Sequence, residues 1–153
     1  MATVYSAQRT NSRATPSVMN KANELGGRIR VAHGTYEAAS LASGDVIEMF
    51  ILPNGARLLE GSLAHDALGA STTLSVGHGA YNNADGTAVS AAAAAYKAAA
   101  ASTSAQKVDI IATMALGSGT ELDADGDGVP VTVTMGGAAG TGTIEVTIKY
   151  VVD

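Results

Sequence analysis

The sequence predicts an all-β protein in the main, an antiparallel β-sandwich or jelly roll of seven to eight strands. Short segments of alternating apolar and polar residues recur from residue 27 onwards, and Gly, Pro, Asn or Asp bounds each of them. The segments do not alternate with helical patterns, which a parallel α/β fold would require. We therefore expect two antiparallel sheets that pack face to face.

The composition suits a protein that packs against other subunits. The chain has 153 residues, which is enough for one domain with a real core. Only 15% of the residues are charged and 4% are aromatic, while small neutral residues are abundant. The sequence contains no cysteine, so disulfides and thiolate chemistry are excluded.

The charge argues against two classes of partner. The formal net charge is −5, whereas a nucleic-acid-binding protein or an anionic-membrane-binding protein usually carries a basic patch. The sequence has no apolar run of about 18 residues, which a spanning helix needs. Its first residues are polar and lack the apolar core of a signal peptide, so we expect synthesis and use without Sec export.

Residues 1–25 differ from the rest and are expected to form an extended N-terminal arm. They are polar and show no sustained hydrophobic period. Two interpretations stay open: a disordered terminus, or an arm that becomes ordered on a neighbouring subunit. In the second case Val4, Tyr5, Arg9 and Arg13 are the predicted partner contacts, because this composition does not support independent folding. Residues 26–153 then form the β-sandwich domain.

The first half of this domain reads as strands separated by turns. The run 45–52 is apolar on both faces, which predicts a strand covered on both sides. Pro, Asn and Gly follow it and favour a tight turn. The predicted strands in this half are 28–33, 45–52, 56–66 and 71–77.

An alanine-rich insert, residues 79–106, interrupts the strands. Alanine has the highest intrinsic helix propensity, so a short helix over 90–101 is favoured, with an irregular loop as the alternative. Strands resume at 107–116, 129–135 and 143–153. The glycine-rich segment 136–142 is expected to join the last two as a hairpin loop.

An Asp-rich turn carries the sharpest local motif. Asp123, Asp125 and Asp127 with Gly128 match positions 1, 3, 5 and 6 of a calcium loop. Thr134 stands where that loop needs a bidentate Glu, and a strand follows in place of a helix. The segment is therefore either a calcium site of another kind, held by the three aspartates, or a solvated turn between strands. Apart from calcium at this turn, no cofactor is expected.

The histidines do not indicate catalysis. His65 and Asp66 are adjacent, and neighbouring side chains of a strand point to opposite faces, so they do not form a catalytic pair. We expect a strand-end His and a turn-starting Asp. His33, His65 and His78 lack the spacing of a zinc site, and no serine lies in a nucleophile elbow. We expect that the protein is not an enzyme.

A family resemblance lies in the run 26–77, where "LPNGARLL" and "LGASTTLSVG" carry it, and in the flanking segments "ATVYSAQRTN" and "GTGTIEVTIKYVVD". On these segments the chain resembles virion structural proteins of tailed bacteriophages, and more narrowly the small head-associated or decoration proteins. The alanine-rich residues 91–101 and the Asp-rich turn are not part of the resemblance. These motifs are architectural, with no catalytic residue to transfer. The resemblance implies a β-sandwich bound to a capsid in many copies, as trimers at threefold positions.

Two classes of function follow. The first is a capsid decoration or cement protein, made in the bacterial cytoplasm, which binds the major capsid protein and copies of itself on the outer surface of the virion. The second is a recognition module for carbohydrate or a host surface, with calcium at the Asp-rich turn. A tail or neck component of the virion is a further alternative to a head protein.

Overall fold

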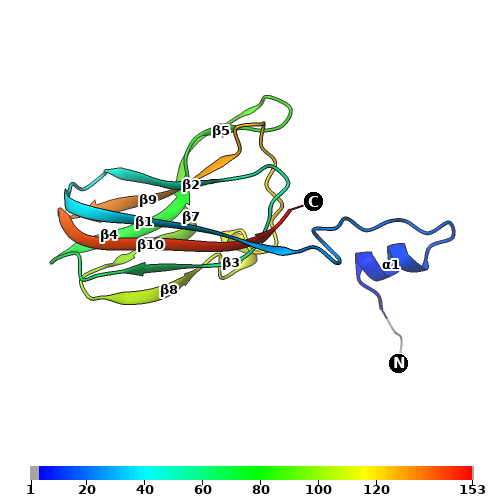
Figure 1. Cartoon of the computed structure of the whole chain (residues 1–153), viewed down its shortest axis with the longest axis horizontal. Coiled ribbons are helices and arrows are strands. Elements are labelled where there is room, and N and C mark those ends of the chain that lie inside the picture. Colours follow the sequence, from blue (N-terminus) through cyan, green and yellow to red (C-terminus); the bar gives the residue numbers. More distant parts are fainter. Residues whose placement is uncertain (1–3, 153) are drawn as a thin grey trace.

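The computed structural model describes residues 4–152, and ten strands, one α-helix and one 3-10 helix form in that part of the chain. Eight strands build a sandwich of two four-stranded antiparallel sheets, with the helix well outside it (Figure 1). The elements are α1 (Ala7–Arg13), β1 (Ile29–Leu41), β2 (Val46–Leu52), β3 (Arg57–His65), β4 (Thr72–His78), β5 (Tyr81–Asn82), β6 (Ala88–Val89), β7 (Ala92–Ala101), β8 (Gln106–Ile110), η1 (Met114–Leu116), β9 (Val129–Gly137) and β10 (Gly140–Val151).

The topology is that of a jelly roll. The first sheet has the order β1-β10-β3-β8, and the second has the order β2-β9-β4-β7. Except between β4 and β7, each of these strands lies in the opposite sheet from the one that precedes it. The strands β5 and β6 form a separate two-stranded ribbon between β4 and β7. This arrangement confirms the predicted fold class.

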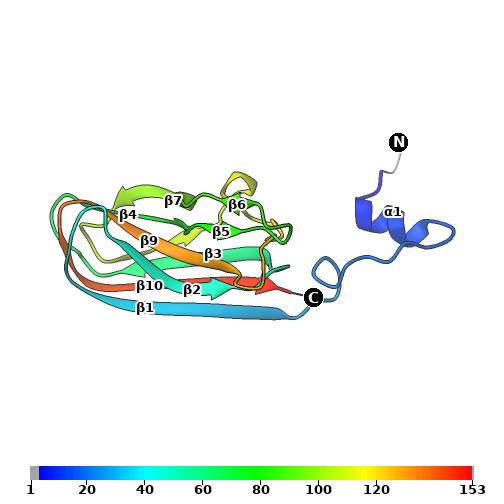
Figure 2. The ribbon, with the colours of Figure 1, turned by 90° about the horizontal axis from the view of Figure 1, so that it is seen from above.

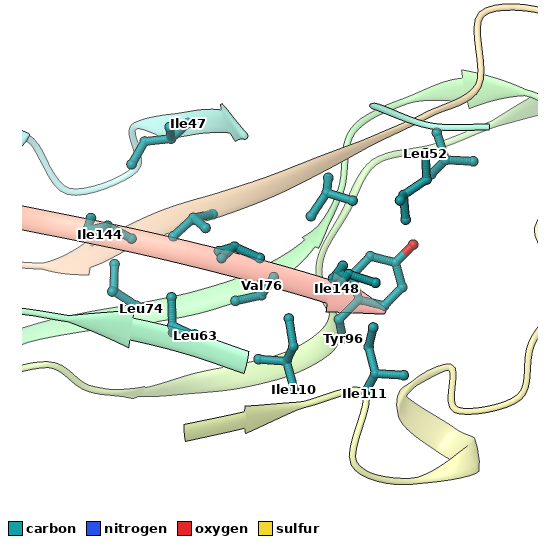
Figure 3. Packing of buried hydrophobic residues seen from close by; sticks show 14 of the residues in the cluster. Ile47, Leu52, Leu63, Leu74, Val76, Tyr96, Ile110, Ile111, Ile144 and Ile148 are labelled. Atoms are coloured by element: carbon teal, nitrogen blue, oxygen red, sulfur yellow. The ribbon is translucent and has the colours of Figure 1, made fainter. Parts of the chain in front are cut away.

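The core lies between the inner faces of the two sheets (Figure 3). Alternating residues of β9 and β10 point inwards, as the period of two predicts. On β9 the side chains of Val131, Val133 and Met135 are fully buried, and β10 contributes a matching row. That row consists of Ile144, Val146 and Ile148.

The segment between β9 and β10 is not the predicted hairpin loop. The two strands lie in opposite sheets, so the short link at residues 138–139 crosses from one sheet to the other. Gly137 has a φ of 76°, which favours glycine. A Cβ at Gly140 would lie 2.7 Å from Met135 Cε, so the start of β10 passes close to the core. Alternation assigns a face to each residue but does not choose the partner strand.

The prediction that β2 is covered on both faces was also wrong. The pairing of β2 with β9 shifts register between Glu48 and Phe50, which marks a bulge at Met49. The bulge places both Ile47 and Leu52 in the core although their spacing is odd. Val46 and Ile51 consequently face outwards and are 59% and 55% exposed.

The alanine-rich segment forms β7, an edge strand, and neither a helix nor a loop. Strand β4 pairs with it, with two register shifts along its length. Tyr96 turns inwards and is buried among core residues, and its carbonyl accepts a hydrogen bond from the Ile111 amide at 3.0 Å. A twelve-residue alanine helix is marginal in water, so sheet hydrogen bonds and the burial of one tyrosine override its propensity.

The predicted strand 107–116 is interrupted after Ile110. Ile111 has a positive φ of 58° and is buried, and the chain then turns through the 3-10 helix η1. The backbone break places Ile111 in the core on a different path from β8. The strand therefore ends at Ile110, and after the buried Ile111 the chain becomes exposed, with Met114 88% exposed.

The N-terminal arm is partly helical, which corrects the expectation of a fully extended segment. Ser6 caps α1, and its Oγ accepts a hydrogen bond from the Arg9 amide at 3.3 Å. The arm projects from the end of the sandwich that also carries the C-terminal end of β10 (Figure 2). No residue of α1 is buried. Among the described residues, no helix is long and apolar enough to cross a membrane.

Candidate functional site

The arm folds back on itself through one asparagine. Asn20 Nδ2 lies 3.2 Å from the Gln8 carbonyl and 3.2 Å from Ser12 Oγ, and its Oδ1 accepts from Asn11 Nδ2 at 3.2 Å. These bonds tie the segment that follows α1 to the helix. The arm therefore has a defined local shape even though the sandwich does not cover it.

Large apolar side chains are exposed along the arm. Val4 is 90% exposed and Met19 is 92% exposed, and Tyr5, Val18 and Leu25 are exposed as well. Of the eleven large hydrophobic residues that are exposed within residues 4–152, five thus lie in this short segment. Exposed apolar groups gathered in one place are typical of a surface that another macromolecule covers.

The four predicted contact residues all lie on this exposed arm. The Arg13 guanidinium carbon lies 4.7 Å from the centre of the Tyr5 ring, so the fold brings these two side chains together across α1. Val4 precedes the helix, and Arg9 lies within it. Their contact with a partner stays a prediction.

The charges of the arm and the sandwich are opposite in sign. Residues 1–20 carry Arg9 and Arg13 and no acidic residue, while residues 29–152 carry twelve acidic and five basic residues. The arm is therefore a basic and apolar element on an acidic body. It suits an acidic partner surface with apolar depressions.

Ion pairs join residues 21–24, the base of the arm, to the sandwich. Lys21 Nζ lies 2.8 Å from Glu121 Oε1, and Arg57 Nη2 lies 2.8 Å from Glu121 Oε2 and 3.5 Å from Glu24 Oε1. The hydrogen bond from Lys21, followed by that from Asn23, holds the pKa of Glu121 below its ordinary value. Sequence reasoning missed this cluster because its members lie far apart in the chain and form no motif.

The Asp-rich turn places the carboxylates of Asp123 and Asp125 on different partners. Asp123 Oδ1 accepts from the Ala84 amide at 3.2 Å, and Asp125 Oδ1 accepts from the Asp127 amide at 3.0 Å. Asp125 Oδ2 lies 3.4 Å from Asn82 Nδ2. In residues 4–152 no group of three or more His, Cys, Asp or Glu side chains is placed to hold a metal ion. Calcium binding by these aspartates stays a prediction, and this geometry does not add to it.

His65 and Asp66 lie where the sequence predicted, at the end of β3 and the start of a turn. His65 Nδ1 lies 2.7 Å from the Asp66 carbonyl oxygen, and Asp66 Oδ2 accepts from the Thr143 amide at 3.0 Å. The carboxylate thus fixes backbone and does not orient the imidazole. His33 lies on the outer face of the first sheet and contacts Thr147 Oγ1 at 2.9 Å.

An open groove of about 500 Å³ runs along β3, β8 and β10. Gly61 lies in it, and Ser62, Asp109, Thr147 and Lys149 contribute polar atoms. Its lining contains no aromatic ring, whereas sugar sites usually stack the sugar on one. The groove therefore does not favour carbohydrate recognition.

The comparisons with known proteins connect the fold to phage capsids. No protein-family model matches the sequence, and no curated protein matches it. A chain of the solved structure "Cyanophage Pam1 capsid asymmetric unit" is 20% identical with a TM-score of 0.64, and the match covers 100% of both chains. A chain of "Capsid of Ralstonia phage GP4" is 25% identical with a TM-score of 0.61, over 83% of this chain and 86% of that chain. The chain shares its fold with these two chains.

Proposed function

We propose that this chain is a structural protein of a tailed-phage virion. Specifically, it is a decoration or cement protein that binds major capsid protein subunits on the outer surface of the head and stabilises the shell. The observation that carries this proposal is the match to a chain of the Ralstonia phage GP4 capsid, which extends over most of both chains. The match to the Pam1 chain, which includes the arm, supports the same fold.

The exposed arm supplies the mechanism of attachment. It presents apolar side chains and two arginines away from the sandwich, so it reaches a neighbouring molecule without rearrangement of the core. A pre-shaped arm loses less conformational entropy on binding than a disordered one. The contact of one arm is small, but many copies on a lattice act together through effective concentration.

The proposal extends to the assembly of the protein with copies of itself. Small neutral residues line the outer surface of β7, where Ala93, Ala94, Ala98 and Ala99 are exposed. Such a surface permits close approach of another subunit. A homotrimer is the assembly that the resemblance to decoration proteins implies.

Deletion of residues 1–13 tests the proposed function. The variant should fold, because no residue of α1 is buried, but its occupancy on purified phage heads should fall at least tenfold. Occupancy is measured by quantitative gel analysis after sedimentation of the heads. The oligomeric state of both proteins is measured in parallel by light scattering.

A matched pair of charge variants separates arm contacts from general electrostatics. The double variant Arg9→Gln, Arg13→Gln removes two positive charges from the arm, and Arg30→Gln, Lys107→Gln removes two from the sandwich. The first should weaken binding to heads more than the second. Equal occupancy of the wild type and the arm deletion would overturn the role of the arm. Binding to tails or glycans, without binding to heads, would replace the proposed function.

A further inference from the structure

The base of the arm is held at one point of the sandwich. Lys21, Asn23 and Glu24 provide hydrogen bonds that join the two parts, whereas α1 and the segment after it bond with one another. Asn23 is buried and donates to the Gly55 carbonyl at 3.2 Å. The direction in which the arm projects therefore depends on what fixes residues 21–24.

Glu121 is the centre of this junction. Both of its oxygens accept from Lys21 Nζ, at 2.8 Å and 3.0 Å, and Oε2 also accepts from Arg57 Nη2 at 2.8 Å. Arg57 is in turn fixed on the sandwich, because its Nη1 donates to the Gly119 carbonyl at 2.6 Å. One carboxylate thus joins a cation of the arm to a cation of the sandwich.

The negative charge of Glu121 lies between two positive charges at the junction. Without that charge Lys21 and Arg57 would repel each other. Glu24, which pairs with Arg57, is the other acidic group of this cluster. Single exposed ion pairs contribute little to the stability of a fold. The effect of this cluster should therefore appear in the orientation of the arm and not in the unfolding of the sandwich.

We propose that Glu121 is a positioning residue whose carboxylate locks residues 21–24 onto the sandwich and thereby fixes the direction of the arm. This inference rests on the proposed function in one respect, because it takes the arm to be the element that contacts the capsid. A fixed direction would present the arm in its binding geometry before contact is made.

The distance between two spin labels tests the lock on the isolated full-length protein. The natural chain contains no cysteine, so Ser17→Cys on the arm and Ala115→Cys in η1 introduce two unique labelling sites, both exposed. Pulsed electron resonance then gives the distribution of distances between them. We expect one narrow distribution for the labelled wild type at pH 7, and a distribution at least twice as wide for Glu121→Gln.

The pH dependence of the distance distribution provides a second test, because a residue with a merely structural role would not make the distribution change with pH. The pKa of Glu121 is lowered in the folded protein, so its charge persists at pH values somewhat below the ordinary glutamate pKa and is lost as pH falls through the lowered pKa. The wild-type distribution should broaden over that range. The Glu121→Gln distribution should be broad at pH 7 and should not change with pH.

Two further variants serve as controls. Glu60→Gln removes a carboxylate that pairs with Lys149 on the sandwich, away from the arm, and it should leave the distribution narrow. Lys21→Met should broaden the distribution as Glu121→Gln does, and it leaves the sandwich partners of Glu121 intact. Circular dichroism verifies that each variant is folded.

A narrow distribution for folded Glu121→Gln or for Lys21→Met would overturn the lock. A pH-dependent distribution in Glu121→Gln would also overturn it, because another group would then be responsible. No capsid is present in the measurement. A failure of the lock is thus distinguishable from a failure of the decoration function, which the assay on phage heads reports separately.

Discussion

The hydroxyl of Ser102 donates a hydrogen bond to the hydroxyl of Thr72 at 3.0 Å, and both side chains are completely buried. Thr72 Oγ1 in turn donates to the Gly69 carbonyl at 2.8 Å. The Ser102 backbone also joins this junction, since its amide donates to the Thr72 carbonyl and its carbonyl accepts from the Leu68 amide. The pair therefore connects the start of β4 to the end of β7 at the far end of the sandwich from the arm.

Substitution of Thr72 by Val should destabilise the fold by about 1–3 kcal/mol, because it leaves the buried Ser102 hydroxyl without its acceptor and removes the hydrogen bond to the Gly69 carbonyl. Thr72→Ser keeps the hydroxyl and should cost clearly less. Urea unfolding followed by circular dichroism measures both. A Val variant as stable as the Ser variant would show that the hydrogen bonds do not contribute.

Gly77 in β4 should not tolerate even a methyl group. A Cβ there would collide with the carbonyl group of Ala92 and the carbonyl carbon of Ala93, both in β7. These are backbone atoms, which do not move easily. Gly77→Ala should lower the free energy of unfolding by about 1–3 kcal/mol or more. Gly126→Ala is the matched control, since a Cβ there meets nothing within 4 Å, and its effect should stay within about 0.5 kcal/mol. Equal stability of the two variants would contradict the close approach of β7.

Asp66 should stabilise the protein in a pH-dependent way. The hydrogen bond from the Thr143 amide lowers the pKa of this carboxyl, so its contribution is present above the unfolded value, about 3.9, and is lost as pH falls through the folded pKa. Asp66→Asn should therefore unfold at a lower temperature than the wild type at pH 7. The difference should shrink below about pH 4. Asp109→Asn on the neighbouring strand β8 is the charge control, and a pH-independent difference for Asp66→Asn would refute the prediction.

The Asp-rich turn should depend on Asp125 whether or not calcium is present. Asp125 accepts hydrogen bonds from the Asp127 amide and from Asn82, so Asp125→Ala should lower the melting temperature by a few degrees in the presence of a chelator. If the aspartates hold calcium, millimolar calcium should raise the melting temperature of the wild type, and Asp125→Ala should abolish that rise. The absence of a rise in the wild type would leave the segment as a solvated turn between strands.

The sequence was informative wherever the period of two reflects burial. The inward rows of β9 and β10 follow directly from the alternation of Val, Ile and Met with mostly polar residues, and the turn at Pro53–Gly55 follows from residues that set φ. The end of β3 at His65 was predicted as well. These features are local, because each residue's own chemistry and spacing determine them.

Of the candidate site, the sequence indicated the arm but not its shape or its anchor. Polar composition marked residues 1–25 as separate from the sandwich. The contact of Lys21 with Glu121 joins residues one hundred positions apart, and no local sequence pattern predicts it. The stacking of Arg13 on Tyr5 likewise requires the helix to form first.

By itself the sequence determined that this protein is an antiparallel sandwich with a small-residue surface and a separate arm. Composition and periodicity are sufficient for that conclusion. Only the tertiary structure decided which strands pair, that β9 and β10 lie in opposite sheets, and that an alanine-rich segment becomes the edge strand β7. The physical reason is that partner choice depends on long-range packing and on hydrogen bonds to a neighbouring strand, which outweigh local propensity.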